Sequence, residues 1–156
     1  MLKKIIKFLC YLQGMRVAIQ SFHWAADNMS KHKELDNIYE LIGDKMDELA
    51  EMSQAVYGRI PANAITATEQ KFKSGDVALD NLLINLEVFH KELKDDKLDL
   101  GLRSSIEDFI AQADRQKYLL GLTMNEGKER QTLSIKESTL REVVESVVDS
   151  LAGWQV

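Results

Sequence analysis

Apolar residues recur along most of this chain at steps of three and four, the spacing of one face of an α-helix. The first such stripe consists of Leu2, Ile5, Leu9, Leu12, Arg16, Ile19 and His23. It predicts a helix over about residues 3–28. Asn28 and Ser30 then suit the start of a second helix, which the pattern continues to Tyr57 and Gly58 ends. These two helices are expected to form a hairpin.

Two further helices follow the same rule. Ser74 suits the N-cap of a third helix through about Lys94, and a fourth is predicted over about residues 100–123. Residues 59–73 hold the single proline, Pro61, and show weak periodicity, so we expect a connection there with one short helical turn across the end of the bundle. A link of that length favours parallel neighbours, the second and third helices.

A fifth amphipathic helix is predicted near the C-terminus. Ser134 and Glu137 have the spacing of a capping box. The apolar face that follows comprises Leu140, Val143, Val144, Val147, Val148, Leu151 and Trp154. The predicted organisation is therefore an all-α four-helix bundle over residues 1–124, with two hairpins joined by one long crossover. Residues 125–156 form a helical extension expected to pack on the bundle or on a neighbouring subunit.

Composition narrows the class of protein. The 156 residues are enough for one domain with a sizeable core. Cys10 is the only cysteine, which excludes a disulfide framework and favours a reduced, cytoplasmic setting; we expect it to be a small core residue. No stretch is apolar enough to span a membrane. The net charge of −5 argues against DNA binding, because gripping phosphates requires a basic surface.

Five residues have the chemistry of metal ligands. His23 lies in a Phe-His-Trp sequence, and His32, Asp36, Asp47 and Glu51 follow on the second predicted helix. Because a helix turns by about 100° per residue, the last four fall at about 0, 40, 60 and 100°, in one stripe away from the apolar face. That apolar face comprises Leu35, Ile38, Ile42, Met46, Leu49, Ser53 and Val56. Imidazole and carboxylate together suit iron, although a solvated charged face gives the same pattern.

The five-residue pattern resembles the ferroxidase signature of the Dps-type mini-ferritins, a ferritin-like family. The steps of four, eleven and four from His32 to Glu51 match, and the likeness extends over roughly residues 3–122. The step of nine residues between His23 and His32 is shorter than the family's usual twelve, the family's lysine-rich DNA-binding arm is missing, and the fifth helix is an addition.

The resemblance implies a ferroxidase and iron-storage protein. Fe²⁺ would be oxidised by peroxide or oxygen at a dinuclear site between two subunits of a dodecamer, which protects against oxidative damage. His23, His32 and Asp36 would come from one chain, and Asp47 and Glu51 from its partner. The alternative is a non-catalytic helical structural or interaction protein with the same bundle. A nucleoid protein that compacts DNA is disfavoured by the charge.

Other residues with suitable chemistry have simpler interpretations. His90 lies beside an apolar helix face and is expected to be structural. Asp95, Asp96 and Asp99 form an acidic turn that is more often a charged loop than an iron-entry pore. Trp24 is expected to be an interface aromatic or to lie over the metal site.

Overall fold

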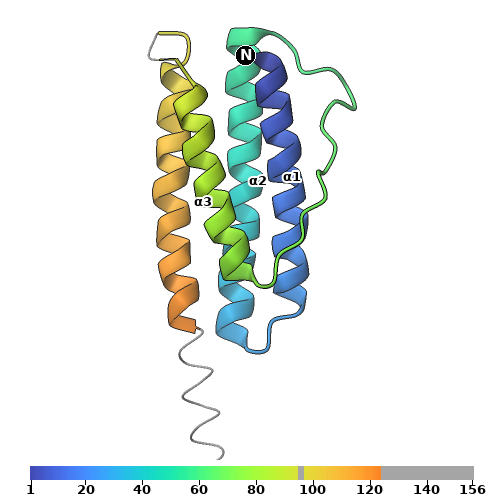
Figure 1. Ribbon diagram of the computed structural model, residues 1–156, viewed down its shortest axis with the longest axis vertical. Helices are drawn as coiled ribbons and strands as arrows, with labels where there is room; N and C mark the ends of the chain where they lie inside the picture. The colour runs from blue at the N-terminus through green and yellow to red at the C-terminus, as the bar shows by residue number, and fades with distance from the viewer. Residues whose placement is uncertain (95–96, 124–156) are drawn as a thin grey trace, which may run out of the picture. The chain divides into compact units, whose positions relative to one another are not determined.

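The chain folds as an all-α four-helix bundle (Figure 1). The computed structural model describes residues 1–94 and 97–123. Its helices are α1 (Leu2–Trp24), α2 (Met29–Tyr57), α3 (Gly75–Glu92) and a further helix over residues 100–123. Up to Gly121, these elements belong to one compact unit. The predicted fifth helix lies outside the described residues.

The turn between α1 and α2 is set by Asn28. Its side chain accepts a hydrogen bond from the backbone N–H of Lys31 at 2.8 Å, and its own backbone is extended, with φ −147° and ψ 159°. An extended cap residue ends any helix that precedes it. The prediction that the first helix reaches residue 28 is therefore wrong by four residues, because α1 ends at Trp24.

The connection between α2 and α3 runs beside α1 instead of crossing the end of the bundle (Figure 1). No helical turn is assigned over residues 58–74, so the short helix predicted there is absent. The backbone N–H of Thr68 donates to the carbonyl oxygen of Cys10 at 3.0 Å, and the N–H of Thr66 donates to Cys10 Sγ at 3.4 Å. Cys10 is thus half-buried beneath the connection, not within the core as predicted.

This connection returns the chain to the end of the bundle where α2 began, so α2 and α3 run parallel, as predicted (Figure 1). The helix over residues 100–123 then runs antiparallel to α3. Two antiparallel hairpins joined by one long crossover make up the bundle, which confirms the predicted connectivity.

The core consists of the apolar stripes that the sequence predicted. Leu12, Ile19, Leu35, Ile38 and Ile42 are fully buried. Apolar residues on the inward faces of α3 and of the helix over residues 100–123 are fully buried as well. Val56, which we placed on the apolar face of α2, is 38 % exposed, although Tyr57 next to it packs against the core. In the part of the chain described here, no helix is long and apolar enough to cross a membrane.

Candidate metal centre

Two candidate ligands meet at the turn between α1 and α2. His23 belongs to the last turn of α1 and His32 to the first turns of α2, and their ring centroids are 3.8 Å apart. Nδ1 of His23 lies 3.0 Å from the backbone oxygen of His32, and Nδ1 of His32 lies 3.0 Å from the backbone oxygen of His23. The two residues therefore hold each other in a reciprocal pair of hydrogen bonds.

This arrangement assigns the protons on both rings. A carbonyl oxygen only accepts hydrogen bonds, so Nδ1 of each histidine is the donor and carries the proton. A ring that is protonated at Nδ1 alone has its lone pair on Nε2. Metal-binding histidines usually donate their other N–H to a carbonyl or carboxylate in this way, which fixes the ring and its tautomer. The pair therefore fixes the orientation of both rings, whose planes are tilted by 33° to each other.

Asp36 is the third candidate at this end of α2. Its Oδ1 lies 3.9 Å from His23 Nδ1, and its side chain is half exposed, against 15 % exposure for His23. A carboxylate that shared a cation with His23 would lie on the Nε2 side of the ring. The Asp36 carboxylate lies instead near Nδ1, the nitrogen that carries the proton. The structure therefore brings His23 close to both His32 and Asp36.

Asp47 and Glu51 lie elsewhere. Both are exposed on α2, and Asp47 is separated from His32 by an axial rise of about 22 Å. One cation cannot join these two positions in a single chain. Over residues 1–94 and 97–123, no group of three or more His, Cys, Asp or Glu side chains is arranged to hold a metal ion. A complete centre would need a second copy.

The exposed face of α2 is strongly acidic. Glu40, Asp44, Asp47 and Glu51 are all exposed, and Asp36 is partly so. Arg16 of α1 lines a cleft of about 220 Å³ together with Gly43 and Asp47. Its guanidinium carbon lies 4.1 Å from the ring centroid of Tyr39, and its Nε is buried without a hydrogen-bond partner. Arg16 therefore weakens the field of Asp47 without pairing with it.

The sequence analysis overlooked a charged cluster between α2 and the helix over residues 100–123. Lys45 is only 8 % exposed, and its Nζ donates to Asp108 at 2.6 Å and to Glu48 at 2.7 Å. The ammonium group neutralises two carboxylates between helices, which is what a metal does in bundle di-iron proteins. The sequence does contain a signal for this cluster. Lys45 lies three residues after Ile42 and four before Leu49, which places it at the edge of the buried face of α2.

The remaining polar candidates join helices to one another. His90 Nε2 lies 2.8 Å from Glu107 Oε1, so this histidine links α3 to the helix over residues 100–123. Asp99 is fully buried; it accepts hydrogen bonds from the hydroxyl of Tyr57 and, at 2.7 Å, from the N–H of Lys94. Its backbone oxygen also accepts a hydrogen bond from the N–H of Arg103 at 2.8 Å, at the start of the helix over residues 100–123. Asp95 and Asp96 lie outside the described residues.

Trp24, unlike these polar residues, makes little contact with the rest of the chain: 71 % of it is exposed. Met29, the first residue of α2, is 77 % exposed. Both flank the histidine pair at the α1–α2 turn. A tryptophan this exposed does not pack over the pair within one chain, which leaves the interface interpretation of Trp24 open.

Comparison with known proteins identifies a family. A sequence model described as a family of unknown function, DUF5856, matches residues 23–120, which include all five candidate ligands. No curated protein and no solved structure matches the chain.

Proposed function

Because the chain belongs to DUF5856, a family of unknown function, we propose a function from its own residues. We propose that it is an iron-binding ferroxidase and iron-storage protein of the mini-ferritin kind, with a site completed across a homodimer interface. Fe²⁺ and peroxide or oxygen are its substrates. The connectivity supports this, since ferritin-like bundles share the single long crossover. Connectivity alone does not imply function.

The observation that carries the proposal is the histidine pair. Two imidazoles from different helices have their Nδ1 protons committed to backbone carbonyls, so both Nε2 lone pairs remain for a cation. Side chains preorganised in this way lose little entropy on binding a metal. Asp36 adds a negative charge near the pair.

A two-fold axis brings the remaining ligands to this pair. If two copies of α2 cross antiparallel, the end that carries His32 and Asp36 in one copy meets the end that carries Asp47 and Glu51 in the other. The axis then passes near Glu40 and Asp44, midway between the two groups. Two equivalent sites form, each with imidazoles from one subunit and carboxylates from its partner.

The chemistry follows from that ligand set. Carboxylate and neutral imidazole bind Fe²⁺ and favour its oxidation, because carboxylates stabilise the higher charge of Fe³⁺. Each of two Fe²⁺ ions loses one electron, and one hydrogen peroxide accepts both as its O–O bond breaks, yielding two hydroxide ions. In a shell of twelve subunits the ferric product collects as mineral.

The test is ferrous oxidation by the full chain. We expect ferric absorbance to rise faster with protein than in buffer after Fe²⁺ and peroxide are added, and Glu51→Gln to slow this rise by about ten-fold or more. Glu87→Gln, which removes an exposed carboxylate from α3, is the matched control and should leave the rate unchanged. A wild-type rate equal to buffer, or equal losses in both variants, contradicts the proposal.

The second candidate is a non-catalytic helical structural or interaction protein. The reciprocal hydrogen bonds favour it, because they already join α1 to α2 without a metal. Under this alternative, His32→Ala lowers the melting temperature in chelator, and wild-type protein melts at the same temperature with or without Fe²⁺. Under the ferroxidase proposal, Fe²⁺ raises the wild-type melting temperature, since a ligand that binds only the native state stabilises it.

A further inference from the structure

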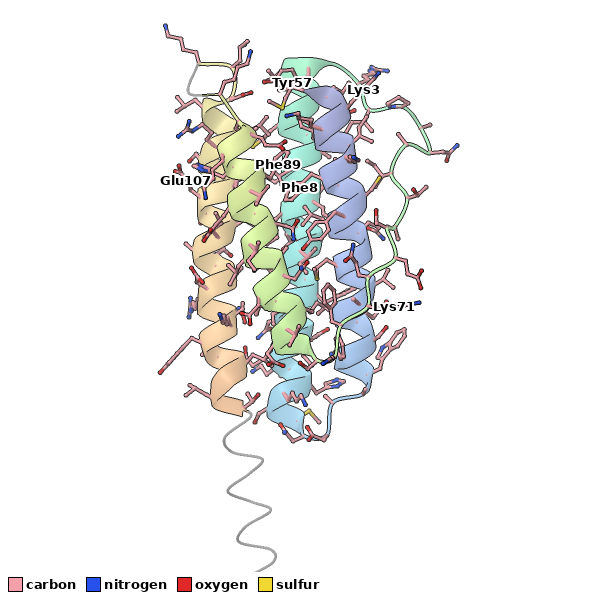
Figure 2. The ribbon with its side chains drawn as sticks, viewed as in Figure 1. Lys3, Phe8, Tyr57, Lys71, Phe89 and Glu107 are labelled. Carbon is pink, nitrogen blue, oxygen red and sulfur yellow. The ribbon has the colours of Figure 1, made fainter. Side chains whose placement is uncertain are left out.

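A groove in the bundle is remote from the histidine pair. It encloses about 470 Å³ between the first turns of α1, the last turns of α3 and the crossover. Figure 2 shows two of its residues, Phe8 and Phe89, between α1 and α3. Neither the histidine pair nor the acidic face of α2 contributes to it.

The floor of the groove is aromatic and rigid. The rings of Phe8 and Phe89 are stacked with centroids 4.1 Å apart and planes 4° apart, and the Tyr11 ring follows at 5.9 Å from that of Phe8. Val88, which is 52 % exposed, adds an aliphatic wall. Phe8 and Phe89 are only 8 % and 5 % exposed, so Val88 offers most of the apolar surface that a nonpolar group in the groove would cover.

Among the described residues, the only carboxylate in the groove lining is that of Glu92, at one edge, and the other lining side chains carry no negative charge. Tyr11 donates its hydroxyl proton to Asn81 Oδ1 at 2.8 Å, and burial raises the pKa of Tyr11 far above its ordinary value. The phenol therefore stays neutral. Asn85, also in the lining, is held by donating to the carbonyl oxygen of Asn81 at 2.8 Å.

The rim carries an unbalanced positive charge. Lys4 pairs with Glu92 at 3.3 Å, which accounts for the one carboxylate in the lining. Lys7 is exposed and has no carboxylate partner among the described residues. An apolar floor beside a free ammonium group is complementary to a molecule with an apolar body and an anionic head.

We propose that this groove binds a small anionic amphiphile. The apolar body lies against Phe8, Phe89 and Val88, and the carboxylate or sulfonate head pairs with Lys7. The body is either aromatic or a fatty acyl chain, because both present nonpolar surface and the same head group. This site is independent of the proposed iron chemistry.

The experiment is a fluorescence titration of the full chain with anilinonaphthalene sulfonate, an aromatic anion. Laurate and uncharged dodecanol then compete for the probe, so that displacement by laurate identifies the fatty source. We expect saturable binding that Lys7→Glu weakens roughly five-fold. Lys73→Glu makes the same charge change at an exposed position before α3, at the opposite end of that helix from Val88 and outside the groove, so it should weaken binding less than about two-fold.

Val88→Asp tests the apolar wall with a second variant at an exposed position. It should weaken the probe and laurate alike, and circular dichroism checks that each variant keeps its helices. Equal binding by wild type and both groove variants would overturn the proposal. Equal losses in Lys7→Glu and Lys73→Glu, or displacement by dodecanol as effective as by laurate, would show that the head group makes no specific contact and would overturn it too.

Discussion

At the scale of single residues, the histidine pair shows how one arrangement supports two interpretations. His23 and His32 satisfy each other's Nδ1 protons, which is useful both for closing a helical hairpin and for presenting two Nε2 atoms to a cation. The sequence identified these residues by type and spacing alone. It gave no sign of the reciprocal bonds, because the nine-residue step places the rings together only once the Asn28 turn is formed.

Lys45 permits a prediction about pH. Burial disfavours its charge, but its hydrogen bonds to Asp108 and Glu48 outweigh this and raise its pKa. The same bonds are the main cause that lowers the pKa of both carboxyls. A carboxyl with a lowered native pKa stabilises the fold above its ordinary range and loses that contribution as the pH falls. The raised pKa of Lys45 contributes below the ordinary lysine range and is lost in strong alkali.

We therefore expect Lys45→Met to lower the free energy of unfolding by about 1–2 kcal/mol near neutral pH, because two carboxylates then face each other without a cation. This penalty should shrink as the pH falls below about 4 and both carboxyls become protonated. Urea unfolding at a series of pH values measures it. Lys117→Met, which breaks the more exposed pair with Asp80, should cost less. A Lys45 penalty that does not change with pH contradicts the assignment.

At the scale of elements, the crossover depends on one glycine of α1. A Cβ atom at Gly14 would overlap with the carbonyl oxygen of Thr68, which is backbone and cannot rotate away. Gly14→Ala should thus displace the crossover and lower the free energy of unfolding by about 1–3 kcal/mol, even though alanine favours helix. Gly121→Ala, where a Cβ meets nothing within 4 Å, should be neutral or slightly stabilising. Thermal melting of both variants compares them directly, and equal melting temperatures would contradict the close contact.

How much the sequence predicted differs between helices and connections. Helix positions follow from local signals such as Asn28, Gly58 and the apolar stripes, so four helices were placed within a few residues. The path of the crossover depends on contacts between residues far apart in sequence, such as Thr68 with Cys10. No periodicity reports such contacts. For the same reason Asp99 seemed to be a loop carboxylate, although Tyr57 of α2 holds it in the interior.

At the scale of the whole molecule, charge decides how two copies can meet. The net charge is −5, and the exposed face of α2 concentrates Glu40, Asp44, Asp47 and Glu51. Two such faces repel each other, since like charges within a Debye length are not fully screened. Pairing across this face requires cations between the copies, so the proposed iron site and the proposed dimer depend on each other.

Association should therefore require metal. In chelator we expect light scattering to report a monomer, because repulsion between two acidic faces opposes contact. Fe²⁺ added without oxygen should raise the mass to a dimer or to the larger shell, since each cation binds imidazoles of one copy and carboxylates of the other.

Asp47→Asn should shift this transition to higher Fe²⁺ concentration, whereas Glu87→Gln should leave it in place. Potassium chloride screens the repulsion but supplies no ligand bridge, so it should not replace Fe²⁺. A dimer that persists in chelator, or a monomer that persists in saturating Fe²⁺, would mean that α2 does not form the site with a second copy.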